Sequence, residues 1–345
     1  MFMQSSVRSA ACRMAARVSW VALFTVACSA DPATSGLDGS TGTSGAGGAG
    51  AAGGSSQASA GGAGGSGAAG GAPADATGSA GATGSGGDPG SGGAGAGGAG
   101  PLPDITIWIA GDSTVANGQT PCPAGWGGQL DALFDERVTV VNSAVGGRSV
   151  RTWLYHVQNT MDDTGECALT RDASGEPLLQ DRWVQMLDGM KPGDYLFIQF
   201  GINDGSRTCD RHVGLDAFKA SYGMMALAAQ ERGAQPVFVT PVSAIACNGS
   251  TARGTRGGYV TATHEAGREH GVPVIDLHEL SVALYNSLSF CPVPGGDVSA
   301  TTAGPVGEFF CDDHTHFARS GAEQIARVVA GAIRDQALGL AAYLE

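Results

Sequence analysis

From Asp104 onward, short apolar runs alternate with longer stretches in which apolar residues recur at helical spacing. The short runs are rich in β-branched and aromatic residues and are bounded by turn residues, which predicts buried strands. These runs span residues 105–110, 138–141, 195–200, 237–240 and 272–277. The stretches between them predict helices at 126–134, 178–190, 215–232 and 259–270, and a last helix at 318–343. This alternation predicts an α/β fold in which helices cover both faces of a parallel sheet.

Glycine is concentrated in one segment that precedes this pattern. Of the 57 glycines, 28 fall between Asp31 and Gly100, a segment without Lys, Arg or aromatic residues. Such a composition cannot build a core and behaves as a flexible coil. We therefore expect an export signal at residues 1–30, a disordered linker at 31–103, and one folded domain at 104–345, which is long enough for a well-buried interior.

The N-terminus has the pattern of an export signal. Three arginines precede the apolar run Val18–Ala27, which is too short to span a bilayer of about 30 Å. Thr25–Cys28 resembles a bacterial lipobox, in which Cys28 is lipid-modified and becomes the first residue of the mature chain. Simple cleavage after Ala30 is the alternative. We expect an exported lipoprotein at the cell surface or in the periplasm, or else a secreted protein.

Cysteine and charge counts bear on the disulfides and on the partners of the protein. Of eight cysteines, two are removed or lipidated, and six remain in an oxidising compartment, which predicts three disulfides of open pairing. Residues 101–345 carry 16 Lys and Arg against 28 Asp and Glu. This acidity disfavours nucleic acid and bare anionic membrane as partners, so we expect membrane contact only through the lipid anchor.

Polar residues follow three of the predicted strands. These segments are GDST at 111–114, NSAVGGRS at 142–149 and GINDG at 201–205. In parallel sheets, ligands bind beyond the carboxyl ends of the strands, so the three segments are expected at one edge. CDDHTHF at 311–317 precedes the last helix and can reach the same edge. The pattern therefore brings Ser, Asn, Asp and His together.

These residue types fit nucleophilic catalysis. A serine hydroxyl needs a base within hydrogen-bond reach and a third group that orients the base. Ser113, His316 and Asp313 can supply these roles. Negative charge on a tetrahedral intermediate needs prearranged donors, which the Ser113 and Gly147 backbone N–H groups and the Asn203 amide can provide. Glycine at 147 lets the backbone approach the substrate.

In their order and residues, the four segments resemble the motifs of SGNH (GDSL-type) hydrolases. GDST, NxAxGGRS, KPGDYLFIQFGxNDG and DxTHF are similar to the rhamnogalacturonan acetylesterase branch over most of 104–340. The resemblance implies a flavodoxin-like three-layer α/β/α sandwich with a five-stranded parallel sheet, and removal of acetyl groups from pectin through an acetyl-serine intermediate. It implies the same triad of Ser113, Asp313 and His316, with Gly147 and Asn203 as oxyanion donors.

Other residues near these motifs bear on specificity. Ile202 stands where many members of that branch have His, and the Gly- and Pro-containing loop at 289–311 is longer. Arg148 either contacts a charged group of the substrate or pairs with a carboxylate of its own domain. Trp153, which follows the Gly147 segment, is the tryptophan expected at the pocket wall. Asp204 is expected to fix the Asn203 loop through hydrogen bonds.

Alternatives remain open at this stage. Ser113 can cap a helix, and Asp312, Asp313, His314 and His316 have the residue types of a metal site, although we expect His314 to be structural. The enzyme can be an SGNH lipase, thioesterase or esterase for another acyl group, or the chain can be a carbohydrate-binding lipoprotein with a vestigial triad. We expect a metal-independent serine esterase that uses no cofactor and acts on an acetylated polysaccharide.

Overall fold

The structure is a computed structural model that describes residues 101–118, 122–293 and 304–345. The predicted export signal with Cys28 and the linker up to residue 100 lie outside the described residues, as does the middle of the 289–311 loop. No helix in the described part of the chain combines the length and the apolar character needed to cross a bilayer.

A five-stranded sheet forms the centre of the domain, and all its strand pairs are parallel. The strands are β1 (Ile105–Gly111), β2 (Val138–Asn142), β5 (Tyr195–Gln199), β6 (Gln235–Val239) and β9 (Val274–Ile275), in the order β2-β1-β5-β6-β9. Gly111 pairs with Gln199, and Ile109 pairs with Asn142. The carboxyl ends of the three strands that precede the conspicuous motifs therefore meet at one edge.

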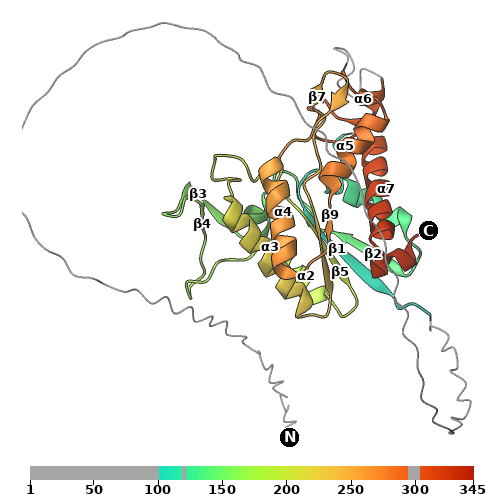
Figure 1. Cartoon of the computed structure of the whole chain (residues 1–345). Helices are drawn as coiled ribbons and strands as arrows, with labels where there is room; N and C mark the ends of the chain where they lie inside the picture. Colours follow the sequence, from blue (N-terminus) through green and yellow to red (C-terminus); the bar gives the residue numbers. More distant parts are fainter. Residues whose placement is uncertain (1–100, 119–121, 294–303) are drawn as a thin grey trace, which may run out of the picture. The chain divides into compact units, whose positions relative to one another are not determined.

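Helices cover both faces of this sheet (Figure 1). One face carries α1 (Val150–Leu154), α2 (Asp181–Gly189), α3 (Leu215–Gln230) and α4 (Gly257–His270). The other carries α5 (Leu277–Ser287), α6 (Pro305–Phe309), α7 (Arg319–Asp335) and the 3-10 turns η1 (Trp126–Gln129), η2 (Asp131–Leu133) and η3 (Gly339–Tyr343). Two small antiparallel hairpins, β3–β4 (Val157–Met161, Cys167–Leu169) and β7–β8 (Cys247–Asn248, Thr251–Ala252), lie outside the sheet. The predicted three-layer α/β/α fold is confirmed.

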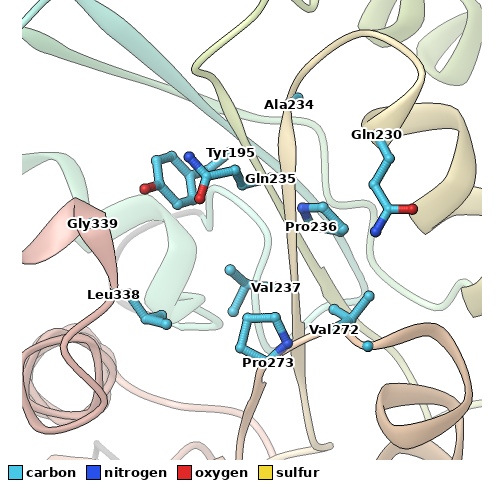
Figure 2. Close-up of a pocket in the computed structure, with 11 residues that line it drawn as sticks. Tyr195, Gln230, Ala234, Gln235, Pro236, Val237, Val272, Pro273, Leu338 and Gly339 are labelled. Atoms are coloured by element: carbon cyan, nitrogen blue, oxygen red, sulfur yellow. The ribbon is translucent and has the colours of Figure 1, made fainter.

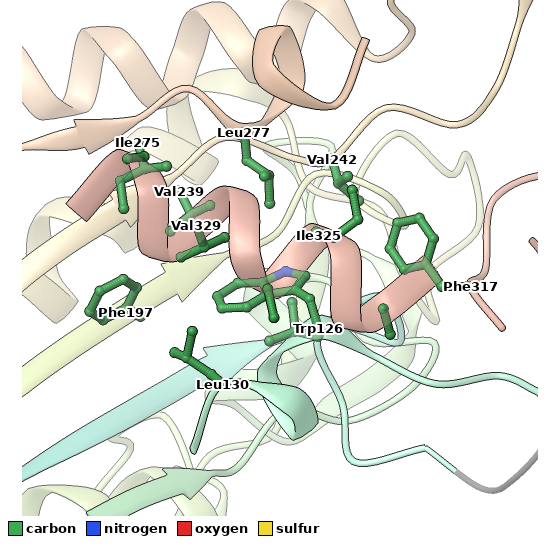
Figure 3. Close-up of a cluster of buried hydrophobic side chains, with 14 of the residues drawn as sticks. Trp126, Leu130, Phe197, Val239, Val242, Ile275, Leu277, Phe317, Ile325 and Val329 are labelled. Atoms are coloured by element: carbon green, nitrogen blue, oxygen red, sulfur yellow. The ribbon is translucent and has the colours of Figure 1, made fainter. Parts of the chain in front are cut away.

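The central strands β1, β5 and β6 send alternate side chains into two separate cores. In β5, Phe197 packs in the core under α7, whereas Leu196 and Ile198 pack in the core under α3. Figure 3 shows the first core, where Ile325 and Val329 of α7 lie over the sheet. Burial on both faces explains why the strands read as continuous apolar runs rather than as an alternating pattern.

Three predicted elements differ from the observed ones. The 126–134 helix is instead two 3-10 turns, and Gly127 in the first of them packs so closely that a Cβ there would lie 2.7 Å from the Val115 carbonyl oxygen. The 272–277 strand is reduced to β9, because Asp276 caps α5 by accepting a hydrogen bond from the Glu279 N–H. The last helix ends at Asp335 instead of continuing to 343.

Candidate active site

Ser113 lies on a tight turn that follows the central strand β1. The Asp112 carbonyl accepts hydrogen bonds from the N–H groups of Val115 (3.2 Å) and Ala116 (3.0 Å). The Asp112 carboxylate Oδ1 accepts two more, from the N–H (2.9 Å) and hydroxyl (2.7 Å) of Thr114. Asp112 and Thr114 are fully buried, whereas the Ser113 side chain between them is only partly buried. The turn therefore presents one hydroxyl at the edge of the sheet.

A buried chain of hydrogen bonds supports this turn from the neighbouring strand. The Trp126 indole donates to Gln199 Oε1 at 2.9 Å, and Gln199 Nε2 donates to the Thr114 hydroxyl at 2.8 Å. That hydroxyl in turn donates to Asp112. Every donor in the chain has a partner, so the network holds the serine turn without leaving a buried amide unsatisfied.

Asp112 itself is an electrostatic exception. Its second oxygen, Oδ2, is buried without a hydrogen-bond partner among the described residues. Burial raises the pKa of Asp112 to about 6, although the bonds from Thr114 and the nearby charges of His316 and Arg256 act in the opposite direction. The carboxyl directly before the serine therefore binds its proton up to a higher pH than a solvent-exposed aspartate does.

His316 and Asp313 lie on one short turn before α7. Asp313 Oδ1 accepts from the backbone N–H groups of Thr315 (3.0 Å) and His316 (2.9 Å), and Oδ2 lies 2.5 Å from His316 Nδ1. Burial acts to raise the pKa of Asp313, but the hydrogen bonds from His316 and Thr315 outweigh it and hold the pKa below its usual value. The other ring nitrogen, Nε2, lies 2.7 Å from the Ser113 hydroxyl.

A disulfide and one backbone hydrogen bond join this turn to the segment after β1, and a second backbone bond closes the turn itself. Cys122 is bonded to Cys311, and the two Cα atoms are 6.0 Å apart. The Ala124 N–H donates to the Phe317 carbonyl at 2.8 Å, and the Cys311 N–H donates to the His316 carbonyl at 2.7 Å. The turn that carries the imidazole is thus fixed on both sides of His316.

Donors that can still bond to a ligand oxygen occur at Ser113, in the Gly147 turn and on the Asn203 side chain. Within the described residues, neither the Ser113 nor the Gly147 backbone N–H donates to a protein acceptor. Gly147 has φ +74°, a conformation that favours glycine, and a Cβ on Gly146 would lie 3.6 Å from Ser113 Cβ. The Asn203 amide nitrogen gives one hydrogen to the Arg148 carbonyl at 3.0 Å and has a second to offer.

Asp204 holds the two donor loops together, as the sequence predicts. Its Oδ2 accepts from the Gly201 N–H at 2.8 Å, at the start of the Asn203 loop. Its Oδ1 accepts from the Val150 N–H at 2.9 Å, just beyond the Gly147 loop. Asp204 is fully buried, and this burial raises its pKa to about 7. The carboxyl therefore serves to shape the site and does not reach Ser113.

Comparison with known proteins agrees with this geometry. Residues 109–324 match the model of the GDSL-like lipase/acylhydrolase family. The chain belongs to this family. It is therefore a carboxylic ester hydrolase, and the expectation drawn from the motifs is confirmed.

Named relatives of this GDSL-like hydrolase include two proteins of Bacillus subtilis. The chain is 30% identical to the rhamnogalacturonan acetylesterase RhgT over 70% of this chain and 94% of the relative. It is 29% identical to the probable rhamnogalacturonan acetylesterase YesY over 68% of this chain and 94% of the relative. The crystal structure of B. subtilis YxiM has the same fold, with a TM-score of 0.51, 24% identity, and coverage of 69% of this chain and 58% of that one.

The prediction that Trp153 lines the pocket is wrong. Its side chain is fully buried between Trp183 and Phe200, with ring centroids 6.0 and 5.9 Å away. Its indole N–H donates to the Ser143 carbonyl at 2.9 Å. The short helix α1 turns this face of Trp153 toward the sheet, so the indole supports the loop after β2 from beneath instead of facing substrate.

The remaining predicted residues divide between surface and interior. Among the described residues, no carboxylate pairs with Arg148, and its contact with substrate stays a prediction. Ile202 is 9% exposed and packs inside the Asn203 loop. His314 has a φ of 57°, and its carbonyl accepts from the Ile245 N–H at 3.0 Å, while its buried Nε2 has no partner in the described ranges.

The six cysteines in the described part of the chain form two disulfides rather than the three predicted. They are Cys122–Cys311 and Cys247–Cys291. Cys167 and Cys209 are buried thiols, and burial, followed by the effect of the neighbouring Cys209, raises the pKa of Cys167 to about 12. Counting cysteines does not reveal which pairs the fold brings into bonding geometry.

The alternative of a metal site requires at least three of the acidic and His side chains around residue 313 to face one point. Over the ranges that the structure describes, no three His, Cys, Asp or Glu side chains are arranged in this way. Asp313 and His316 bond to each other, and the Asp312 side chain is exposed.

A pocket of about 240 Å³ lies at the opposite end of the sheet (Figure 2). It is lined by residues at the starts of strands, including Tyr195 of β5, Gln235 of β6 and Pro273 before β9. Ser113 and His316 lie beyond the other ends of the strands, so this pocket is separate from the triad.

Two residues of the site escaped the sequence analysis. Gln199 is a polar residue within an otherwise apolar strand, and that interruption was a signal for its buried hydrogen-bonding role. Arg211 lies in the loop after Asn203, and its guanidinium donates to Asn203 Oδ1 at 3.4 Å. No sequence pattern marks Arg211, because its position depends on how the 201–214 loop folds.

Proposed function

We propose that this hydrolase removes acetyl groups from a polysaccharide, with rhamnogalacturonan as its substrate. The observation that carries the proposal is the continuous contact from Asp313 through His316 to the Ser113 hydroxyl, beside the Gly147 and Asn203 donors. The names of the two B. subtilis relatives supply the acyl group and the polymer.

In the first half of the reaction, Ser113 Oγ attacks the acetyl carbonyl carbon while His316 Nε2 takes the hydroxyl proton. Asp313 accepts from Nδ1 and stabilises the imidazolium that forms. The carbonyl oxygen becomes negatively charged and is bound by the N–H groups of Ser113 and Gly147 and by the Asn203 amide. The sugar oxygen then leaves with the proton that His316 returns, and acetyl-serine remains.

The second half repeats the same steps with water. His316 takes a proton from water, whose oxygen attacks the acetyl carbon of the acyl-enzyme. The same three donors bind the second oxyanion. Collapse of this intermediate breaks the bond to Ser113 Oγ, and His316 gives the proton back to the serine. The balance is one ester and one water consumed, with one sugar hydroxyl and one acetic acid formed.

The test of this activity is acetate release by the full-length protein from acetylated rhamnogalacturonan and acetylated xylan. Ser113→Ala is expected to lower kcat by on the order of 10⁴-fold or more, because the nucleophile is lost. Ser250→Ala changes an exposed serine and is the matched control. A preference for acyl chains longer than acetyl would refute the proposal and favour a lipase, thioesterase or other esterase. Unchanged turnover in Ser113→Ala would refute it in another way, because the activity would then come from elsewhere and the chain would fit a carbohydrate-binding lipoprotein with a vestigial triad.

We also propose that the enzyme is exported and anchored through a lipid on Cys28. The support is the N-terminal sequence alone: an arginine-containing start, the short apolar run Val18–Ala27, and the lipobox-like end. In a bacterial host, the protein should fractionate with membranes, and Cys28→Ala should release it. Membrane retention of Cys28→Ala would show that another part of the chain holds it.

A further inference from the structure

The loop that carries Asn203 also places a cation beside the oxyanion donors. Arg211 Nη1 donates to Asn203 Oδ1 at 3.4 Å. A methyl group on Gly147 would lie 3.6 Å from Arg211 Nη2. The guanidinium therefore lies against both the Asn203 side chain and the Gly147 turn.

The backbone around Arg211 is fixed in place. The Arg211 N–H donates to the Thr208 carbonyl at 3.1 Å, and the Val213 N–H donates to the Asp204 carbonyl at 3.0 Å. His212 Nδ1 lies 2.6 Å from the Ser206 carbonyl oxygen. Because these bonds fold the segment back on itself, they hold the backbone of Arg211 where its side chain reaches Asn203.

Little within the protein neutralises this guanidinium. In the described part of the chain, its ion-pair partner is Asp210, whose Oδ2 is 3.6 Å from Arg211 Nε. The two side chains are 62% and 47% exposed, so water screens the pair strongly. Asp210 also accepts a hydrogen bond from the Thr208 hydroxyl. Most of the five N–H donors of Arg211 are thus left for another acceptor.

The cations near the site contrast with the negative net charge of the whole chain. The whole chain carries a formal net charge of −13, which repels a polyanion. Two further cations have no ion-pair partner among the described residues: Arg148 before α1, and the exposed Arg256 at the start of α4, whose charge acts on Asp112. A planar guanidinium with parallel N–H groups matches a carboxylate, to which it can donate two bonds at once.

We propose that Arg211 forms a binding site for a carboxylate of the substrate, so that the enzyme prefers acetyl esters on acidic sugars over esters on neutral ones. This inference rests on the proposed esterase activity and adds the charge of the substrate to it. Arg211 selects the substrate by binding its carboxylate, and the chemical step remains with Ser113 and His316.

The experiment compares matched acidic and neutral esters. The full-length protein and its Arg211→Gln, Arg211→Lys and Arg268→Gln variants are assayed on acetylated polygalacturonate and on the same polymer after methyl esterification of its carboxylates. Arg211→Gln is expected to raise KM for the acidic polymer about 10-fold, with kcat within twofold of the value for the unchanged protein. KM and kcat for the methylated polymer should stay unchanged. Arg211→Lys should restore part of the preference. Arg268, an exposed residue at the far end of α4, is the control.

A loss of kcat that is equal on both polymers would overturn the proposal, because it would show that Arg211 only positions Asn203. Equal kinetics for Arg211→Gln and the unchanged protein would overturn it as well. If no polymer is deacetylated, the proposed polysaccharide function fails, and the subsite is then tested with 4-acetoxybenzoate against its methyl ester. A preference for the acid that Arg211→Gln abolishes supports the subsite, and no preference for the acid refutes it.

Discussion

His316 Nε2 lies 2.7 Å from the Ser113 hydroxyl, although 203 residues separate the two in the chain. The contact joins the turn after the central strand to the turn before the last helix. Proton transfer at this distance needs no rearrangement of either backbone.

Asp313→Asn should lower kcat by on the order of 10³- to 10⁴-fold. The amide presents N–H groups toward His316 Nδ1, which no longer has an acceptor, so the imidazole loses the tautomer that accepts the serine proton. Steady-state kinetics on 4-nitrophenyl acetate measure the effect. Asp312→Asn, at the exposed neighbouring position, should retain full activity. Comparable rates in the two variants would remove Asp313 from the triad.

Asn203→Ala should lower kcat by about 10²- to 10³-fold, because one oxyanion donor is lost. KM should change little, since the donor acts mainly on the transition state. Asn248→Ala, an exposed asparagine in the β7–β8 hairpin, is the control. A variant in which only KM rises would show that Asn203 binds the ground state of the substrate.

Asp112→Asn should change how stability depends on pH. Burial raises the pKa of Asp112 to about 6, so the folded state prefers the protonated form, and stability falls as pH rises from 3.8 through 6. The asparagine keeps an acceptor for Thr114 and carries no charge. The free energy of unfolding of the variant, relative to that of the unchanged protein, should therefore increase by up to about 3 kcal/mol when the pH is raised from 4 to 7.5. Urea unfolding at both pH values tests this, with Asp188→Asn as the exposed control.

Asp204→Ala should lower the free energy of unfolding by about 2–5 kcal/mol, because the buried N–H groups of Val150 and Gly201 both lose their acceptor. Activity should fall too, since these groups set the positions of the Gly147 and Asn203 loops. Denaturant titrations and kinetics on one sample report both effects. Asp163→Ala, an exposed change, should alter neither. Loss of stability with full activity would mean that the donor loops hold their shape independently.

The two disulfides should differ in their effect on catalysis. They close segments with sequence separations of 189 and 44, for which loop entropy predicts stabilities of about 4–5 kcal/mol each. The Cys122→Ser/Cys311→Ser double variant should lose kcat as well, because Cys311 is two residues from Asp313. Cys247→Ser/Cys291→Ser should lose only stability. Kinetics at a temperature where circular dichroism shows both variants folded will separate the effects, and equal kcat values would exclude a role for the first disulfide at the site.

The sequence predicts those site residues that come directly after a strand of the parallel sheet. Parallel pairing puts Gly111 beside Gln199, so the motifs that follow β1 and β5 lie close together. This closeness can be predicted without knowing how the side chains pack. Periodicity does not reveal what depends on the path of a loop. Trp153 follows a site motif yet turns into the core, and Arg211 reaches Asn203 only because the 201–214 loop folds back. Disulfide pairing is a tertiary property for the same reason.

Asp313 and His316 are three residues apart on a single turn. In the proposed triad, the base and the carboxylate that orients it therefore belong to one turn. The contact between His316 and Ser113 joins this turn to the other part of the site. A displacement of the turn separates both groups from Ser113 together and never leaves a misoriented base beside the nucleophile. We therefore expect the position of this one short turn to decide whether the enzyme is active or inactive.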